Sequence, residues 1–390
     1  MAHKIQQIAL FLDPSPGYMA DVVMGVQEFA RTGRAWSVEV CHSLPIATAS
    51  TASWKPDGVL VNCSDGEWGP LLRSLDVPTV QVGGQLTPGF PRVLTDNGAI
   101  GAMAARHFLE RGFRRFAFFG YGFLGWSNER GQAFTDALAK DGHTCEWFRA
   151  EPGQIHTHHV TGLIADWVKS LPKPVALFAC HDRAAMLLGH ACAYLGCDVP
   201  GDVALLGVDN NPLECGFTTP PLSSVMGSAR RIGYQAAALL DQMLRDGTRS
   251  VPADFTQLVA PAGVAVRQST DAFGSDDPDL VAALHFIRDH AHEPIDVSDV
   301  ATAAIVTRRM LERKFRAALN RSPRQHILWA HIEQAKKLLI NTGQSMLEVS
   351  DGSGFPSRSK FSAVFKRETG LTPVAFRKLY GSTAATPLRS

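Results

Sequence analysis

Three charged side chains stand in segments that follow strand-like runs in the first two-thirds of the sequence. Arg130 lies within Trp126–Phe134, Asp182 within Cys180–Ala185, and Asp209 within Gly207–Asn211. Because ligands of open α/β sheets bind outside the carboxyl ends of the strands, we expect these side chains to reach one site. For a single aspartate a helix N-cap explains the position equally well. For the three charges together, ligand binding is the better interpretation.

Two other motifs suggest chemistry that their surroundings do not support. Gly120–Gly125 has the G-x-G-x-x-G spacing of dinucleotide-binding loops, but it lies mid-domain, and the acids that follow it, Asp136 and Asp141, stand on or at the end of a helix. His156–His159 has no Cys, Asp or Glu at ligand spacing, which favours solvated loop histidines over a metal site. No Ser-His-Asp elbow or paired-carboxylate signature stands out, so the sequence predicts no catalytic residue, no metal and no cofactor.

A different chemistry is indicated near the C-terminus, where two similar segments, 297–315 and 347–365, lie 50 residues apart. In each, an apolar pair at i and i+4 marks the buried face of a helix, and basic residues stand at its start. Such a helix suits the major groove of DNA, where Arg bonds bidentately to guanine. The candidate DNA-contacting residues are Thr307, Arg308, Arg309, Arg313, Ser357, Arg358 and Lys360.

The charge distribution supports this interpretation. The whole chain has a net charge of +1, but residues 278–390 carry 17 basic and 10 acidic residues, and residues 1–277 carry 21 and 27. A basic C-terminal third on an acidic body indicates a polyanionic partner. Charge alone leaves chance clustering open, whereas the repeat makes it improbable.

The elements that must position these residues fall into two classes. Through residue 267, short apolar runs alternate with amphipathic stretches, which predicts a doubly wound parallel sheet covered on both faces. Residues 268–277 are polar and aperiodic and are expected to form a linker. Every segment of 278–381 favours helix, and 382–390 is expected to be a disordered tail.

Composition narrows the class further. The 390 residues are 45% hydrophobic and 19% charged, which is globular composition and excludes a fibrous or wholly disordered chain. No apolar run reaches the roughly 18 residues of a membrane span, and the N-terminus shows no secretory signal. Seven dispersed cysteines without Cys-x-x-Cys spacing are typical of reduced thiols in the cytoplasm.

Residues 278–381 resemble the DNA-binding domain of AraC/XylS-type regulators. The resemblance rests on the two repeats, the helix 326–340 between them, Gly354-Phe355, and the closing segment 370–377. It implies a double helix-turn-helix domain. Ile305 departs from it, standing where many relatives carry a turn glycine, and Gly352 is expected mid-helix, at a cost of roughly 1 kcal/mol against Ala.

Residues 1–267 resemble the periplasmic-binding-protein-like sensors of the lactose-repressor type. The resemblance implies two lobes around a cleft in which polar side chains bond sugar hydroxyls and aromatic faces cover the sugar ring. The ligand-binding residues it implies are Tyr18, Asp96, Trp126, Arg130, Asp182, Asp209 and Asn210. Such a sensor joined to an AraC-type domain is similar to the xylose-operon-regulator type. Relatives that sense xylose carry an acidic residue where this chain has Met19, which implies another pentose or a related sugar.

The resemblances imply a cytoplasmic, sugar-responsive transcription regulator, more an activator than a repressor. Its expected partners are a double-stranded DNA operator, a small sugar, RNA polymerase in the case of an activator, and a second copy of the chain in a homodimer, with no membrane. Two alternatives stay open at this point. One is a sugar-modifying α/β enzyme with an appended DNA-binding module, and the other is a regulator that senses a non-sugar metabolite.

Overall fold

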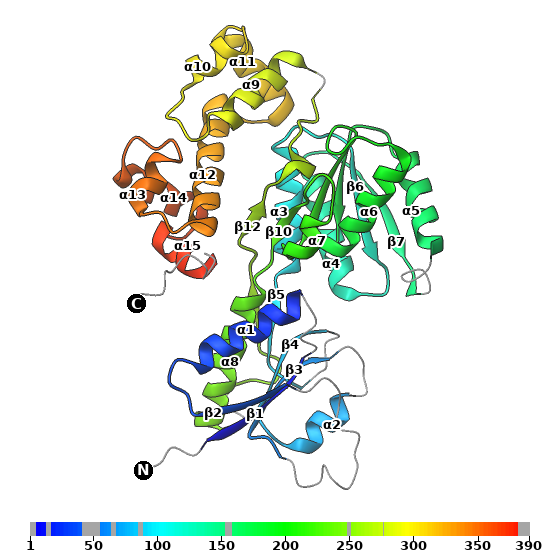
Figure 1. Cartoon of the computed structure of the whole chain (residues 1–390), viewed down its shortest axis with the longest axis vertical. Helices are drawn as coiled ribbons and strands as arrows, with labels where there is room; N and C mark the ends of the chain where they lie inside the picture. Colours follow the sequence, from blue (N-terminus) through cyan, green and yellow to red (C-terminus); the bar gives the residue numbers. More distant parts are fainter. Residues whose placement is uncertain are drawn as a thin grey trace.

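The computed structural model describes residues 5–12, 17–40, 55–63, 68–84, 89–152, 158–247, 251–275 and 277–380. Two α/β lobes are joined end to end, and a helical domain lies along one side of them (Figure 1). The expected fold class, a two-lobed sensor followed by a double helix-turn-helix domain, is confirmed. The expected tail, 382–390, and part of the histidine cluster at 156–159 lie outside the described residues.

The first lobe, called the N-lobe here, contains a six-stranded sheet in the order β11-β5-β4-β3-β1-β2, and all its strand pairs are parallel. Its elements are β1 (Gln6–Phe11), α1 (Tyr18–Ala30), β2 (Trp36–Val40), β3 (Gly58–Cys63), α2 (Trp68–Leu75), β4 (Thr79–Gly84), β5 (Arg92–Thr95), α8 (Ala229–Asp246) and β11 (Thr256–Val259).

The second lobe, called the C-lobe here, has the order β12-β10-β9-β8-β6-β7, in which only the β10–β12 pair is antiparallel. Its elements are α3 (Asn97–Leu109), β6 (Phe116–Tyr121), α4 (Gly125–Ala139), β7 (Cys145–Ala150), α5 (His158–Ser170), β8 (Val175–Ala179), α6 (Asp182–Leu195), β9 (Val203–Val208), α7 (Pro212–Gly216), β10 (Ser223–Met226), β12 (Gly263–Ala265) and the short 3-10 helix η4 (Gln268–Thr270).

The sequence pattern explains the layering of both lobes. The central C-lobe strands β6, β8 and β9 are buried at every position, as continuous apolar runs require when helices cover both faces of a sheet. The chain crosses between the lobes three times, at 95–97, 226–229 and 259–263. Among the described residues the two sheets are linked covalently at these crossings alone, so the lobes can rotate about them.

The helical domain consists of two small cores connected by the long helix α12. Its elements are α9 (Pro278–Asp289), α10 (Val297–Ala303), α11 (Arg308–Leu319), α12 (Pro323–Asn341), α13 (Met346–Asp351), α14 (Arg358–Thr369) and α15 (Pro373–Tyr380). The apolar pairs Leu311/Phe315 and Phe361/Phe365 are fully buried, one pair in each core. Capping boxes at Asp296, Ser322 and Ser345 fix where α10, α12 and α13 begin.

The segment expected to be a linker begins inside the C-lobe. Ser269 and Thr270 of η4 are buried, and the Ser269 hydroxyl donates to the carbonyl oxygen of Leu205 at 2.6 Å. The remainder leads to α9, where Asp277 caps the helix and accepts a hydrogen bond from Lys314. The expectation that Gly352 lies mid-helix is wrong: α13 ends at Asp351, so the glycine follows the helix and its helical penalty does not apply.

Candidate functional site

Arg130 is the centre of the polar groups on the C-lobe side. Its side chain is only 5% exposed, and its Nε donates to Asn97 Oδ1 at 2.9 Å while its Nη1 donates to the Cys180 carbonyl oxygen at 2.6 Å. The guanidinium lies over the Trp126 ring at 4.9 Å from the centroid. Because these contacts fix the guanidinium group, its remaining nitrogen, Nη2, points in one direction only.

That direction leads to Asp209. Its Oδ1 lies 3.9 Å from Arg130 Nη2, and Asp209 has a backbone φ of 100°, a left-handed conformation that is strained for an aspartate. Oδ1 is buried and accepts no hydrogen bond from any residue the structure describes. Burial raises the pKa of this carboxyl, and the positive charge of Arg130 opposes that rise. A buried acceptor without a donor is costly, so a ligand hydroxyl is the expected partner.

Asp182 is close to this pair but is directed into the lobe. It is fully buried, its Oδ1 accepts from the Ser224 hydroxyl at 2.6 Å, and its Oδ2 accepts from the Asn211 backbone N–H at 2.7 Å. Burial, with a smaller effect from Asp209, raises its pKa to about 8. Its bonds shape the loop that carries Asp209. The N-cap interpretation of Asp182 is wrong, because His181 caps α6 through its ring nitrogen.

Tyr18 stands at the start of α1 in the N-lobe. Its hydroxyl hydrogen-bonds Thr95 Oγ1 at 2.8 Å, and burial raises its pKa to about 12, with smaller electrostatic contributions from Asp209 and Arg130 of the other lobe. A Cβ added at the neighbouring Gly17 would lie 3.3 Å from the side-chain nitrogen of Asn211, so the start of α1 lies against the loop that carries Asp209. We call the following residues the inter-lobe site: Tyr18 of the N-lobe, and Trp126, Arg130, Asp182, Asp209 and Asn210 of the C-lobe.

Asn62 joins this site and was missed by the sequence reasoning. Its Nδ2 lies 3.5 Å from the thioether sulfur of Met19, to which it donates. Its Oδ1 is buried and, among the described residues, has no hydrogen-bond donor. Asn62 stands at the carboxyl end of β3, so the rule that selected Asp209 would have selected it too.

Two predicted ligand residues have structural partners instead of open positions. Asp96 is the N-cap of α3, where its Oδ1 accepts from the Ala99 backbone N–H at 2.8 Å. Asn210 has a φ of 56°, and its Oδ1 accepts from Arg267 Nη2 at 2.7 Å. Asp96 lies in the first crossing and Asn210 in the loop after β9, and these bonds hold both side chains at the edge of the site.

His181 is a second residue that the sequence reasoning passed over. Its ring lies 5.8 Å from that of Trp126 and 5.4 Å from that of Tyr121, measured between centroids. Burial, with a smaller effect from Arg130, lowers its pKa to about 4. The imidazole is therefore neutral near pH 7 and adds an aromatic edge to the C-lobe side.

The candidate DNA surface is built differently. Thr307 and Ser357 are the N-caps of α11 and α14, so each sits where its helix begins. The five basic candidates are all exposed, and their positions are Arg308, Arg309, Arg313, Arg358 and Lys360. Arg308 also pairs with Glu312 of its own helix at 3.2 Å. Exposed cations at the start of two similar helices suit phosphate and base-edge contacts.

The turns before these helices both contain a left-handed residue, Ile305 at φ 55° and Gly354 at φ 72°. The backbone N–H of Val306 bonds the Ala301 carbonyl oxygen, and that of Phe355 bonds Ser350 in the same way. The turns thus align with an offset of 49 residues and the recognition helices with an offset of 50. The second turn is one residue longer.

Within the described part of the chain, no group of three or more His, Cys, Asp or Glu is arranged to hold a metal ion. None of the described helices is long and apolar enough to span a membrane.

Comparison with known proteins covers both parts of the chain. Residues 105–270 match the model of the periplasmic binding protein-like domain, and residues 300–379 match a helix-turn-helix domain. The xylose operon regulatory protein of Escherichia coli K12 is 32% identical over 387 residues, which cover 97% of this chain and 98% of that protein. The Haemophilus influenzae protein of the same name is 32% identical over 389 residues, which cover 97% of this chain and 99% of that protein.

The chain belongs to the family of the xylose operon regulatory proteins. A solved structure of a xylose-binding transcription activator aligns with a TM-score of 0.64 at 31% identity, over 98% of this chain and all of that one. A lactose-repressor-family regulator from Enterococcus faecalis with bound ribose aligns at 17% identity with a TM-score of 0.55, over 68% of this chain and 98% of that one, which shows the shared sensor fold.

Membership of the xylose operon regulator family identifies the chain as a sugar-responsive, DNA-binding transcription regulator. Its relatives are regulators and not enzymes, so the alternative of a sugar-modifying enzyme is set aside. The G-x-G-x-x-G match at 120–125 is explained by the fold: it spans the end of β6, a short turn and the first residue of α4.

Proposed function

We propose that this regulator binds a small sugar in the inter-lobe site and activates transcription of a pentose-utilisation operon in response. The observation that carries the proposal is a pair of buried acceptor oxygens on opposite lobes, Asn62 Oδ1 and Asp209 Oδ1, neither bonded to a described residue. Arg130 supplies a donor beside Asp209. A neutral polyol, with several hydroxyls at fixed spacing, satisfies both acceptors at once and thereby holds the lobes together.

Met19 restricts which sugar fits. Its thioether sulfur accepts a hydrogen bond from the side-chain nitrogen of Asn62, and Met19 offers no strong hydrogen-bonding group to a ligand. The position next to it therefore favours a C–H face of the sugar over a hydroxyl. We infer that the effector is a pentose or a related sugar, in the xylose-like class named for the relatives but different from xylose at this position.

The test is calorimetric titration of the full chain with xylose, other pentoses and their deoxy analogues. Asp209→Ala and Asn62→Ala should each weaken the best ligand about 10- to 100-fold, the loss expected for a hydrogen bond to a charged or buried group. Asp141→Ala, an exposed aspartate in the same lobe, is the matched control and should leave affinity unchanged. If both site variants bind the sugar as tightly as the wild type, the assignment of the site is wrong. If the chain binds a non-sugar metabolite and no sugar, that metabolite replaces the sugar as the proposed effector.

We further propose that the two recognition helices α11 and α14 read operator DNA with the seven residues named above. DNA duplexes can be selected from a random pool by the full-length protein with and without the sugar that binds most tightly in the calorimetric titration. Selected sequences should contain two short boxes about one helical turn apart. Transcription assays with purified RNA polymerase on such a duplex then decide activation, and a lower transcript level with sugar would favour repression.

We infer that the regulator works as a homodimer in the cytoplasm. Tyr194 and Phe217 of the C-lobe are large apolar side chains that are 82% and 75% exposed, and we infer that a second copy covers them. Light scattering of the purified chain tests this, since a monomer at micromolar concentration contradicts it. The domain limits proposed are 1–267, 268–277 and 278–381, although the burial of Ser269 and Thr270 favours including them in any sensor fragment.

A further inference from the structure

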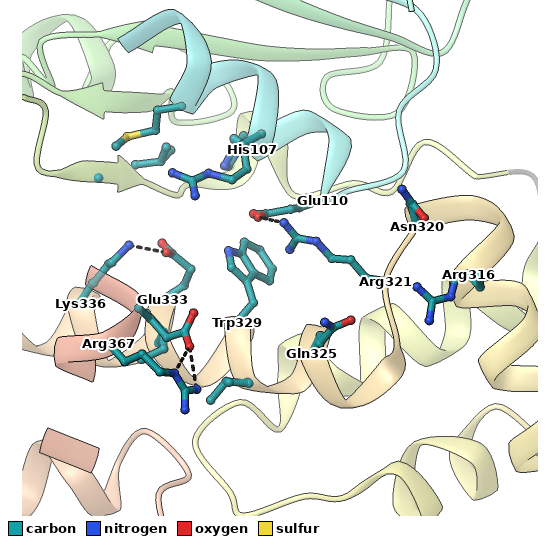
Figure 2. Close-up of a pocket in the computed structure, with 17 residues that line it drawn as sticks. His107, Glu110, Arg316, Asn320, Arg321, Gln325, Trp329, Glu333, Lys336 and Arg367 are labelled. Carbon is teal, nitrogen blue, oxygen red and sulfur yellow. Dashed lines mark hydrogen bonds and ion pairs between the residues drawn. The ribbon is translucent and has the colours of Figure 1, made fainter. Parts of the chain in front are cut away.

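The helix-turn-helix domain contacts both lobes, and the first motif reaches the C-lobe. Arg114 donates to the carbonyl oxygens of Ala317 and Ala318 at 3.2 and 2.7 Å, which caps the end of recognition helix α11. Just beyond that helix, Arg321 pairs at 2.8 Å with Glu110, whose side chain is 5% exposed (Figure 2). The first motif is therefore held by the C-lobe at the base of its recognition helix.

The second motif reaches the N-lobe. Arg231 on α8 donates from Nη1 to the Tyr380 hydroxyl at 2.6 Å, and its guanidinium lies 5.1 Å from the centre of that ring. The ring of Tyr380 packs on that of Phe376 with 4.7 Å between their centroids, and the ring of Phe376 packs on that of Phe365 of recognition helix α14 with 5.3 Å between theirs. A row of touching aromatic rings thus runs from the N-lobe contact into the core behind α14.

The N-lobe end of this row is rigidly coupled to the inter-lobe site. Helices α1 and α8 pack backbone to backbone: a Cβ at Gly25 would lie 1.9 Å from the Arg230 carbonyl oxygen, and one at Gly233 would lie 1.9 Å from that of Val22. Two helices in such close contact move together. Because α1 begins at Tyr18 of the inter-lobe site, a movement of that site carries α8 with it.

The rest of the interface between sensor and helical domain is loosely filled. Two cavities of about 510 and 550 Å³ lie between them. The first is lined by polar groups that include Arg106, Glu110, Arg321 and Glu333, with Trp329 between the two domains (Figure 2). A close-packed interface would resist displacement, whereas one held by a few polar contacts permits it.

We propose that the Glu110–Arg321 and Arg231–Tyr380 contacts tie one recognition helix to each lobe, so that closure of the lobes around the effector sets the spacing of α11 and α14. The two contacts are fixed to bodies that rotate about the three crossings, while α12 joins the two motifs as one continuous helix. A relative movement of the lobes must therefore shift one motif against the other or release one contact. This mechanism rests on the proposed function, because the effector drives the movement.

The experiment measures how much sugar changes affinity for DNA. Selected duplexes are titrated with the full chain, with and without the tightest-binding sugar of the panel, for the wild type and for Arg231→Ala, Tyr380→Phe and Arg230→Ala. Arg230 is the matched control, since it precedes Arg231 on α8 but pairs with Glu28 inside the N-lobe. We expect the sugar-dependent fold-change to fall at least threefold in Arg231→Ala, to fall by less in Tyr380→Phe, and to persist in Arg230→Ala.

Two further readouts separate this role from a general loss of structure. The variant combining Arg231→Ala with Tyr380→Phe should behave like Arg231→Ala alone, because the two side chains share one interaction. Sugar should also bind every variant, and in footprints only the box read by α14 should lose its response to sugar. By reciprocity, the DNA-induced change in sugar affinity should fall by the same factor.

The outcomes separate the two proposals. A wild type whose DNA affinity responds to no sugar of the panel overturns the proposed function and this mechanism with it. A responsive wild type whose response survives Arg231→Ala overturns the mechanism alone. An equal loss in Arg230→Ala also overturns it, since any perturbation of α8 would then suffice.

Discussion

The ionisable side chains of the inter-lobe site and those of the recognition helices are arranged in opposite ways. Arg130 and Asp182 are 5% and 0% exposed, and each is held by several hydrogen bonds. Arg309, Arg358 and Lys360 are exposed at the starts of their helices. A buried side chain is fixed in direction, but its burial costs desolvation free energy. An exposed side chain keeps its full charge and can rotate freely.

The difference follows from the two kinds of ligand. A small neutral ligand must be recognised by the geometry of a few hydrogen bonds, which requires groups fixed before it arrives. DNA attracts its partners through phosphate charge, for which mobile surface cations suffice. We therefore expect substitutions in the inter-lobe site to change stability and binding together, and those on the recognition helices to change DNA binding alone.

The largest expected effect comes from Arg130→Ala. The substitution leaves the buried Oδ1 of the partly buried Asp209 without its nearby cation and removes donors to Asn97 and Cys180. Breaking a buried charge pair typically costs about 3–5 kcal/mol. The thermal unfolding midpoint of the full chain should fall accordingly, and calorimetry should detect no sugar binding.

Arg149→Ala is the control for that comparison. Arg149 also lies over a tryptophan, 4.2 Å from the Trp147 ring centre, but on an exposed edge of the C-lobe. Its loss should cost less than about 1 kcal/mol and leave sugar affinity intact. Equal destabilisation by both substitutions would show that ring stacking, and not the buried charges, accounts for the effect.

The second effect is a dependence on pH that Asp182→Asn removes. The pKa of Asp182 is raised from 3.8 to about 8 in the folded chain, so between these values unfolding releases a proton. Stability contributed by this group is present at low pH and is lost as pH rises, by at most about 1.4 kcal/mol per unit. Amide and protonated carboxyl present similar hydrogen-bond groups, so the fold should tolerate the change.

Thermal unfolding of both proteins from pH 5 to pH 8 measures this dependence. As pH rises, the Asp182→Asn variant should become more stable relative to the wild type, because the other titrating groups are common to both proteins. Parallel curves would show that Asp182 is ionised throughout and would weaken the contrast between buried and exposed charges.

The sequence allowed the fold, and the place of each candidate binding residue within it, to be predicted for physical reasons. Continuous apolar strands followed by amphipathic helices admit few arrangements, and the carboxyl ends of parallel strands share one edge. The recognition helices were predictable because their apolar pairs and N-caps lie close together in sequence. Local patterns of this kind do not depend on distant contacts.

The roles of individual aspartates could not be predicted in the same way. Asp182 and Asp209 follow strands alike, yet one is bonded to Ser224 and Asn211 and the other has a free acceptor oxygen among the described residues. That distinction depends on residues far away in sequence. Asn62, by contrast, was missed although its position at the carboxyl end of β3 obeys the same rule as that of Asp209.

The third prediction concerns the recognition helices, where effects should be confined to DNA. Arg308→Ala and Arg358→Ala should each cost about 1–3 kcal/mol of DNA affinity and relax specificity in one box only. Helix α12 has 19 residues, a length of about 28 Å, which suits adjacent major grooves about 34 Å apart. The effect of Arg308 should be the smaller, because it also pairs with Glu312.

Footprinting on systematically mutated duplexes measures these effects, with unfolding curves as a check on stability. Lys366→Ala, an exposed cation near the end of α14, is the control and should weaken all sequences alike. If both arginine substitutions affected the same base pairs, a two-box arrangement would be wrong. A fall in stability would contradict the expected separation of binding from folding.

The smallest effect concerns the turns before the two recognition helices and is expected to have opposite signs in them. Ile305 is 91% exposed at φ 55°, so its β-branched side chain contributes strain of about 1–2 kcal/mol and no described packing. Ile305→Gly removes that strain but loosens the unfolded chain by about 0.4–1 kcal/mol, for a net gain of roughly 0.5–1 kcal/mol. Gly354→Ala should destabilise instead, since its Cβ would lie 2.5 Å from the Glu293 carbonyl oxygen. Urea unfolding of each variant decides the signs, and a loss of stability in Ile305→Gly would mean that the exposed isoleucine is packed in the assembled regulator.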